Sequence, residues 1–315
     1  MRSLSHPLVT GGAGFIGSTL CRLLLQHPDV EKLTIVDKLT YAGSKDNLPV
    51  DPRIDFHHID IVSKACLNLV FNQTHPTCVF NLAAESHVDR SIEKPEDFIN
   101  TNIVGTENLL EICRHKNVPM IQISTDEVYG SIEAPGIFTE ESPLAPSSPY
   151  SASKASGDLL CLAAHTTYQQ DVVITRCSNN YGSHQYPEKL IPLLIQKAIQ
   201  ELPLPLYGDG QQVRDWIHVE DHCSALIATA LKAPAGTVLN IGANKELTNQ
   251  DVAERVLDIL AKPRELISYT DDRPGHDRRY ALDACKAREL LGWQPIHDFD
   301  TSFAAVVKEI ESKLA

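Results

Sequence analysis

The stretch Thr10-Gly11-Gly12-Ala13-Gly14-Phe15-Ile16-Gly17 decides the fold, because it joins a short apolar run to an amphipathic segment. The run Leu8 to Thr10 is typical of a strand, and Ser18 to Gln26 is typical of a helix. The three spaced glycines permit a tight turn, close approach of the backbone to a pyrophosphate, and close packing of helix on strand. The stretch therefore predicts a dinucleotide-binding loop at the amino end of a helix.

An acidic residue follows where such a loop requires one. Asp37 lies 20 residues after Gly17, at the end of the second predicted strand. A carboxylate there accepts hydrogen bonds from the adenosine ribose and repels a 2'-phosphate, which favours NAD over NADP. Asp60 and Ile61 after the third strand, and Leu82, Ala83 and Ala84 after the fourth, are expected to line the adenine and pyrophosphate side of the same crevice.

The rest of the first half repeats this alternation of short apolar runs with segments of helical length. Strands are predicted at residues 33–36, 54–57, 78–82, 120–123 and 172–176. This rhythm predicts an α/β fold with a doubly wound parallel (Rossmann) sheet over residues 1–177. Residues 178–315, punctuated by Pro, predict a smaller, irregular α/β substrate domain, with strands near 215–219 and 237–242 returning to the first sheet.

Composition excludes several classes of protein. The 315 residues are 43% hydrophobic and carry a formal net charge of -13, which argues against a nucleic-acid partner or an anionic membrane surface. The eight cysteines include no C-x-x-C pair, and no apolar run approaches the ~18 residues of a membrane span. We therefore expect a cytoplasmic protein with no metal site and no membrane partner.

A second informative stretch is Ser124-Thr125-Asp126-Glu127-Val128-Tyr129-Gly130, which follows the apolar run Met120 to Ile123. Neighbouring side chains converge on one ligand only where a strand has ended, since a strand sends them to opposite faces. Thr125, Asp126 and Glu127 are therefore a candidate catalytic cluster at the carboxyl end of a strand. The alternative is a solvated acidic turn.

Tyr150 and Lys154 stand four residues apart on one face of a predicted helix. An ammonium at this spacing can stabilise the phenolate and lower the pKa of Tyr150 toward that of a general base. The alternative is an ordinary surface helix.

These motifs, in this order, resemble the extended short-chain dehydrogenase/reductase family, and within it the dTDP-glucose 4,6-dehydratases. The supporting stretches are Asn81–Ile92, Ser124–Gly130, Arg176–Gly182, Pro187–Pro192, Tyr207–Gly210, Arg214–Trp216 and Asp272–Asp277. The chain departs from the family pattern before Pro7, and it stops at Ala315 without a Trp-rich tail.

The resemblance implies an NAD-dependent hydro-lyase with no net redox change. Tyr150, with Thr125 and Lys154, would take the proton of the sugar C4 hydroxyl as C4 is oxidised. Glu127 would remove the C5 proton, Asp126 would protonate the departing C6 hydroxyl, and hydride would return to C6 to give dTDP-4-keto-6-deoxyglucose. The two carboxyls must then have separated pKa values.

The resemblance also assigns binding residues. Those for NAD are Gly11, Gly14, Phe15, Ile16, Gly17, Asp37, Lys38, Thr40, Asp60, Ile61, Leu82, Ala83, Ala84, Thr101, Tyr150, Lys154 and Asn180. Those for the nucleotide sugar, expected to be dTDP-glucose, are Ser86, Thr125, Asn179, Lys189, Leu190, Pro205, Tyr207, Arg214, Asn249, Arg273 and His276.

A homodimer packed through residues 98–115 and 150–168 is also implied. The alternatives are a 4,6-dehydratase of UDP-glucose or UDP-N-acetylglucosamine, a nucleotide-sugar 4-epimerase, and a dinucleotide-sensing regulator without chemistry. Asp126 and Glu127 count against the epimerase, which needs no acid/base pair after Thr125.

Overall fold

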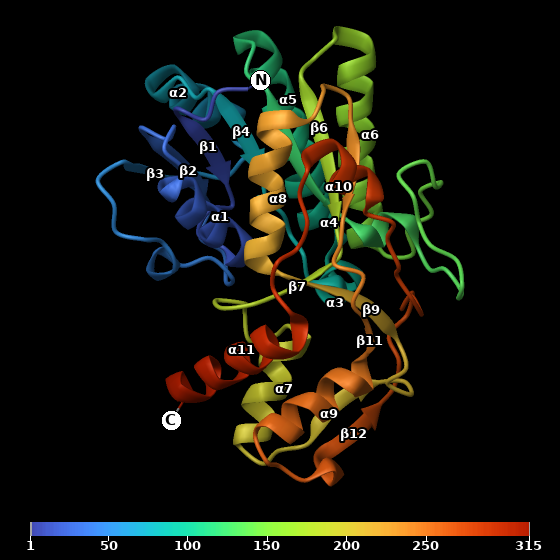
Figure 1. Cartoon of the computed structure of the whole chain (residues 1–315). Helices are drawn as coiled ribbons and strands as arrows, with labels where there is room; N and C mark the ends of the chain where they lie inside the picture. The colour runs from blue at the N-terminus through green and yellow to red at the C-terminus, as the bar shows by residue number, and fades with distance from the viewer. Residues whose placement is uncertain (1, 315) are drawn as a thin grey trace.

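A seven-stranded parallel sheet forms the upper lobe of the structure, a computed structural model that describes residues 2–314 (Figure 1). The strand order is β10-β6-β5-β4-β1-β2-β3, so the direction of winding reverses between β1 and β4. In such sheets the ligand crevice lies outside the carboxyl ends of the strands at this reversal. The strands are β1 (Pro7–Thr10), β2 (Leu33–Asp37), β3 (Ile54–His58), β4 (Cys78–Asn81), β5 (Met120–Thr125), β6 (Val172–Cys177) and β10 (Val238–Ile241).

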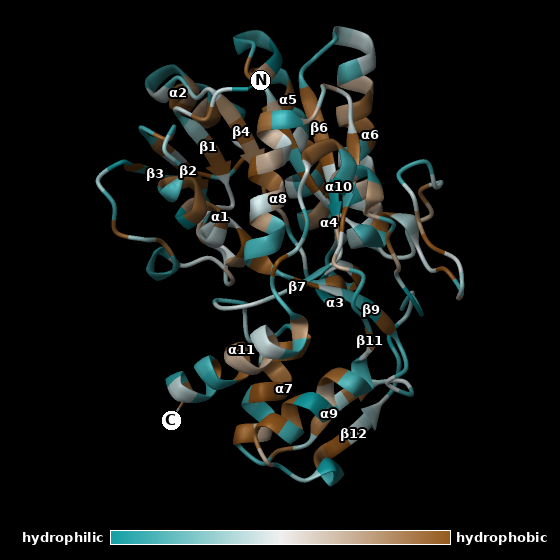
Figure 2. Cartoon of the chain, viewed as in Figure 1, coloured by the Kyte–Doolittle hydropathy of each residue, from teal (hydrophilic) through white to brown (hydrophobic). Residues whose placement is uncertain are grey.

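Helices cover both faces of this sheet, because consecutive strand residues bury their side chains on opposite sides. Val9 packs into one core and Leu8 into the other. The first face is covered by α1 (Phe15–Gln26), α8 (Val219–Lys232) and α10 (Cys285–Leu291), and the second by α2 (Lys64–Thr74), α5 (Thr106–Lys116) and α6 (Pro149–Tyr168). Figure 2 shows the hydrophobic strands between these helices. The predicted doubly wound α/β fold is confirmed.

A chain of short helices leads from β4 to α5 and lies against α6. It consists of α3 (Val88–Glu93), α4 (Pro95–Phe98) and the π-helical segment η2 (Ile99–Gly105). Three short 3-10 helices, η1 (Lys45–Asn47), η3 (Asp126–Tyr129) and η4 (Arg264–Leu266), complete the helices. Of these, η3 holds the acidic pair directly after β5.

The lower lobe has its own apolar core, built from α7 (Leu190–Ile199), α9 (Asn249–Ile259) and α11 (Phe299–Leu314). The two-stranded parallel sheet of β8 (Leu204–Tyr207) and β12 (Ile267–Thr270) packs with them. A three-stranded sheet, in the order β11-β9-β7, lies between the two lobes and contains β7 (Asn179–Tyr181), β9 (Val213–His218) and β11 (Glu246–Thr248) (Figure 1).

One topological prediction was wrong. The strand near 215–219 is β9, which pairs with β7 and β11 and does not return to the main sheet, whereas β10 does return and pairs with β6. The apolarity that suggested a return has another cause, because Trp216 packs into the core of the lower lobe and Ile217 into that of the upper lobe. The first helix also begins at Phe15, three residues before its expected start.

Candidate active site

A cavity of about 320 Å³ lies at the carboxyl ends of the central strands. Every residue that the sequence analysis assigned to NAD lines it, as do all the catalytic candidates. The cavity therefore brings together segments that are far apart in the chain at the edge that the strand order predicts.

The glycine loop is a cradle in which Gly11 and Gly17 leave no room for a side chain. A Cβ atom on Gly17 would lie 2.1 Å from the carbonyl oxygen of Gly11, and one on Gly11 would lie 2.7 Å from the amide nitrogen of Ala83. Helix α1 starts here with no side-chain cap and no acidic residue in its first turn. Its free amides and the positive end of its dipole suit a pyrophosphate.

Asp37 and Lys38 organise the rim of the cavity. Asp37 accepts hydrogen bonds from the amides of Ala13 (2.9 Å) and Leu39 (2.8 Å), which ties the end of β2 to the glycine loop. Lys38 Nζ lies 3.0 Å from Glu85 Oε1 and donates to Thr101 Oγ1 at 3.1 Å. These contacts, with the cradle of glycines, fit a dinucleotide whose ribose hydroxyls face the carboxylate of Asp37.

Asp126 is a buried carboxyl with few partners. Thr125 Oγ1 donates to Asp126 Oδ1 at 3.2 Å, while Asp126 Oδ2 is buried with no hydrogen-bond partner among the described residues. Burial, and then the neighbouring charge of Glu127, raise the pKa of Asp126 well above its usual range. Asp126 is therefore suited to be a neutral acid.

Glu127 stands beside Asp126 in different electrostatic surroundings. Burial raises its pKa too, but the positive charges of Arg273, Arg214 and Lys189 oppose that rise. Three cations favour the charged form of Glu127. Arg214 acts on Asp126 as well, but there the charges of Glu127 and Asp215 oppose ionisation. This is the kind of separation that the acid and base roles require.

Tyr150 and Lys154 lie on the buried face of α6, which starts with a capping box formed by Ser148 and Ser151. The ring of Tyr150 packs edge to face on Phe98 with centroids 6.2 Å apart. Lys154 Nζ donates to the carbonyl oxygen of Ile123 in β5 at 2.6 Å. Helix and strand together therefore fix both residues beside Thr125.

The expected lowering of the pKa of Tyr150 by Lys154 was wrong for this structure. Burial and the charge of Glu127 raise the pKa of Tyr150 well above its usual value, and only a hydrogen bond with Thr125 lowers it. Burial lowers the pKa of Lys154 itself. The physical reason is that Lys154 donates to a strand carbonyl, while the phenol of Tyr150 is buried and is acted on by the charge of Glu127.

The substrate candidates divide into two groups. Ser86, Thr125, Asn179 and Lys189 line the cavity, and Lys189 Nζ donates to the carbonyl oxygen of Ser86 at 2.8 Å. The remaining candidates lie outside its lining, on or next to the elements of the lower lobe; they are Leu190, Pro205, Tyr207, Arg214, Asn249, Arg273 and His276.

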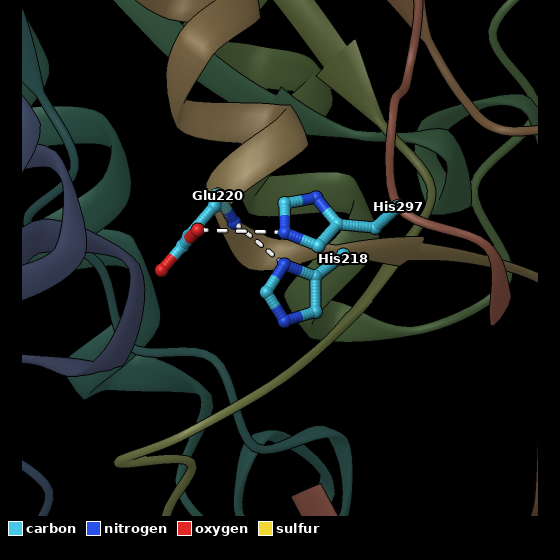
Figure 3. A group of neighbouring side chains, drawn as sticks. All are labelled: His218, Glu220 and His297. Carbon is cyan, nitrogen blue, oxygen red and sulfur yellow. Dashed lines mark hydrogen bonds and ion pairs between the residues drawn. The ribbon is translucent and has the colours of Figure 1, made fainter. Parts of the chain in front are cut away.

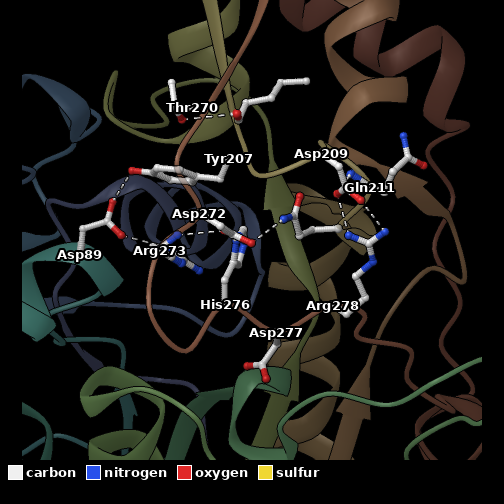
Figure 4. Close-up of polar contacts among 12 residues, drawn as sticks. Asp89, Tyr207, Asp209, Gln211, Thr270, Asp272, Arg273, His276, Asp277 and Arg278 are labelled. Carbon is white, nitrogen blue, oxygen red and sulfur yellow. Dashed lines mark hydrogen bonds and ion pairs between the residues drawn. The ribbon is translucent and has the colours of Figure 1, made fainter.

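Two members of this second group, Tyr207 and Arg273, converge on Asp89 (Figure 4). Tyr207 Oη donates to Asp89 Oδ2 at 3.0 Å, and Arg273 Nη1 lies 3.4 Å from Asp89 Oδ1. His276 Nδ1 lies 2.6 Å from Asp272 Oδ1. Arg273 and Arg214 both act electrostatically on Glu127, which connects this polar cluster to the cavity.

Some cavity residues were not assigned to the site by the sequence analysis. Ser124, Cys177, Ser178, Gln185 and Tyr186 line the cavity but were not given a role there. The first three follow from strand geometry, since they flank the carboxyl ends of β5 and β6. Gln185 and Tyr186 lie in the loop before α7, where the sequence has no periodicity from which the direction of a side chain could be predicted.

Comparisons with known proteins agree with this geometry. A family model described as GDP-mannose 4,6 dehydratase matches residues 8–306. The dTDP-glucose 4,6-dehydratase of Salmonella typhimurium is 45% identical over 330 residues, covering 96% of this chain and 91% of that protein.

Two solved structures are also similar. The dTDP-glucose 4,6-dehydratase of Bacillus anthracis, in complex with NAD, has a TM-score of 0.91 at 45% identity and covers 98% of this chain and 96% of that one. The enzyme of Streptomyces venezuelae, solved with NAD bound, has a TM-score of 0.94 at 45% identity, with coverages of 98% and 97%.

Proposed function

The chain belongs to the GDP-mannose 4,6 dehydratase family, and we infer that it is an NAD-dependent hydro-lyase that converts dTDP-glucose to dTDP-4-keto-6-deoxyglucose and water. The observation that carries this inference is the pair of carboxyls, buried Asp126 and half-buried Glu127, with unlike surroundings next to a Thr, Tyr and Lys set. A simple oxidoreductase or epimerase on this fold has no step for a second acid and base.

The cofactor residues fit NAD through the glycine cradle, the amino end of α1 and Asp37. When bound, NAD supplies the acceptor for the C4 hydride and the donor that returns it to C6. The proposal places the adenosine ribose at Asp37 and the nicotinamide end near Tyr150, Lys154 and Asn180, which line the same cavity.

We propose that Tyr150 receives the proton of the C4 hydroxyl, with Thr125 hydrogen-bonded to it. Because burial raises the pKa of the phenol, a positive charge near Tyr150 is needed for it to act as a base. Lys154 lies on the same buried helix face and is the residue that we propose for this charge, although it is not among the groups that lower the pKa of Tyr150 in this structure. Tyr150 is therefore assigned to the oxidation step.

Elimination of water falls to the acidic pair. With a ketone at C4 the C5 proton becomes acidic, and Glu127, surrounded by three cations, is the base that removes it. Asp126, kept neutral by burial, donates its proton to the C6 hydroxyl as the C–O bond breaks. When hydride is returned to C6, Glu127 gives the proton it holds back to C5, which completes the 6-deoxy sugar.

For the substrate diphosphate we propose Lys189, Arg214 and Arg273, with Asn179 and His276. Arg273 Nε is buried with no partner among the described residues, so it offers a free donor. The sugar is proposed to face Ser86 and the base to face Tyr207. Residues 1–177, completed by β10, would then bind NAD, and most of 178–315 would bind the nucleotide sugar.

Partial reactions test the assignment of the pair. In Asp126→Asn, Glu127 still takes the C5 proton, so deuterium from solvent should enter C5 while water loss falls by about 10²–10⁴-fold. In Glu127→Gln, NADH should form with neither C5 exchange nor water loss. Both variants must retain NAD, which confirms their folding. Equal C5 exchange in the two variants would reverse or remove the assigned roles.

The nucleotide base needs its own test. The protein is incubated in parallel with dTDP-glucose, UDP-glucose and UDP-N-acetylglucosamine, and the mass loss of one water is measured for each. The proposal expects the fastest loss with dTDP-glucose, and no loss with that sugar would refute the choice of base.

A second copy of the chain is the proposed partner at the outer face of η2, α5 and α6. Exposed apolar side chains occur on η2, namely Ile99 (49% exposed) and Val104 (41%), and on α6, namely Leu159 (56%) and Tyr168 (58%). A charged substitution, Leu159→Glu, should convert a dimer to a monomer in light scattering, with the exposed Leu69→Glu on α2 as the control. A wild-type monomer would contradict the proposal.

Cytoplasmic location is also a proposal. All eight cysteines are free thiols, which supports a reducing compartment. Across residues 2–314, none of the helices has the length and apolarity needed to cross a membrane.

A further inference from the structure

Two histidines and a glutamate meet at the junction of the lobes, away from the catalytic cavity. His218 ends β9, Glu220 lies in the first turn of α8, and His297 stands just before α11 (Figure 3). One potential ligand atom from each lies within 4.8 Å of the others. The two imidazole rings stack with centroids 4.0 Å apart.

The protonation of His297 is dictated by Asp221. This buried carboxylate accepts hydrogen bonds from the amides of Ile296 and His297, both at 3.1 Å, and contacts His297 Nδ1 at 2.9 Å. Since a carboxylate only accepts, Nδ1 must carry a hydrogen. This contact fixes the ring so that Nε2 is the nitrogen turned toward Glu220.

The second ring nitrogen faces a carboxylate. His297 Nε2 lies 3.5 Å from Glu220 Oε2. This spacing needs a positive species between the two atoms, which is either a proton on Nε2 or a metal ion that both atoms coordinate. A histidine whose other ring nitrogen donates to a carboxylate is also the usual arrangement of a metal-bound imidazole, because the carboxylate fixes the ring and makes it more basic.

We propose that His218, Glu220 and His297 bind a first-row transition-metal dication of the zinc class. Two imidazoles and a carboxylate suit such an ion better than Ca²⁺ or Mg²⁺, which prefer all-oxygen sites. Tetrahedral Zn²⁺ with bonds of about 2.0–2.1 Å separates its ligands by about 3.4 Å. The spacing of His297 and Glu220 matches this value.

His218 completes the set with a small adjustment. Its Nδ1 accepts a hydrogen bond from the backbone amide of Glu220 at 3.4 Å. This hydrogen bond is long, so a bond from Nδ1 to a metal ion would readily replace it. A polar cavity of about 240 Å³, lined by His218 and Glu220 among others, adjoins the site and leaves room for a water as fourth ligand. No sequence spacing indicates this site, since His297 lies far from the other two ligands.

The bound ion would join three segments. It would fasten the start of α11 to the end of β9 and the beginning of α8. Phe299 and Phe303 of α11 pack on Tyr181, with ring centroids 5.0 and 6.1 Å away. Fixing the start of α11 would therefore also stabilise the apolar core of the lower lobe. Its effect is on the stability of this junction and not on the chemical step.

The test uses the full chain, tag-free and stripped of metal by a chelator, titrated with Co²⁺ and then Zn²⁺. We expect one equivalent of Co²⁺ to give the absorption bands of tetrahedral coordination without a thiolate charge-transfer band, and Zn²⁺ to displace it. Zn²⁺ should also raise the melting temperature. Glu220→Gln and His218→Asn should weaken binding by about 10-fold or more.

His184→Ala is the matched control, because His184 lines the same cavity but contacts Arg22 and lies outside the cluster. It should bind Co²⁺ as the wild type does. Glu220 is exposed, so Glu220→Gln should fold, and retained NAD and dehydratase activity verify this. Absence of a tetrahedral Co²⁺ spectrum, or equal affinity in wild type, Glu220→Gln and His218→Asn, would overturn the proposal.

Discussion

Replacing Gly17 by alanine should damage the dinucleotide loop, whereas replacing Gly14 in the same loop should leave the free protein intact. A Cβ atom added at position 17 would meet the carbonyl oxygen of Gly11 at 2.1 Å and the Cα of Gly12 at 2.8 Å. Both are backbone atoms, so the strain cannot be relieved by rotating a side chain. A Cβ atom added at position 14 would come no closer than 3.4 Å to the protein, which is an ordinary contact.

The magnitude follows from the overlap. Restoring contact distance at position 17 requires the turn to move by more than an ångström, and overpacking of this kind costs about 1–3 kcal/mol. The same displacement removes the turn from its position facing the pyrophosphate. We therefore expect Gly17→Ala to lower the free energy of unfolding by about 1–3 kcal/mol and to weaken NAD binding by about 5- to 150-fold.

Urea unfolding of the NAD-free protein measures the first quantity, and calorimetric titration with NAD measures the second. Gly14→Ala should unfold within about 0.5 kcal/mol of the wild type, as expected where no overlap arises. This expectation would be refuted if the two variants lost equal stability, or if Gly17→Ala bound NAD as the wild type does. In either case the close approach of Gly17 to Gly11 would not determine the shape of the NAD-binding loop.

Three further results are expected. Tyr150→Phe should slow the oxidation of C4 by about 10²–10⁴-fold, followed as NADH absorbance in a single turnover, and an unchanged rate would remove Tyr150 from that step. Because burial raises the pKa of Glu127, water elimination should decline as pH falls through that raised value, an acid limb that Glu127→Gln should lack in a pH–rate profile. Burial lowers the pKa of His222 to about 3. Below pH 6.5, therefore, His222 is protonated in the unfolded chain but not in the folded one. The free energy of unfolding rises with pH up to 6.5 and is level above it. Between pH 7 and pH 5 the wild type should lose about 2 kcal/mol more unfolding free energy than His222→Asn in urea titrations, and parallel losses would contradict this.

The sequence predicted most of the central sheet because each strand there is a short apolar run with a helix on either side. Pairing partners are harder to infer, as β9 shows. The apolar residues of β9 are buried against the cores of both lobes, and hydropathy does not identify the strands that pair with β9. Only the positions of β7 and β11 in space decide that.

The candidate site divides in the same way. Residues that directly follow strands, such as Asp37, Ala83 and Thr125, could be placed because parallel strands end at one edge. The direction in which the pKa of Tyr150 shifts could not be predicted, because it depends on burial and on the charge of Glu127, which lies on another element. Likewise, the contacts of Tyr207 and Arg273 with Asp89 join residues from separate lobes.

The return of β10 (Val238–Ile241) to the main sheet also bears on how the protein is made. A nascent chain that has emerged only as far as Cys177 exposes the edge of β6, and it lacks α8, which covers one face. Unpaired strand edges and bare apolar faces promote aggregation. The ribosome must therefore deliver β7, α7, β8, β9, α8 and β10 before the upper lobe can close. We expect a gene cut after codon 177 to encode an aggregation-prone chain that does not fold on its own.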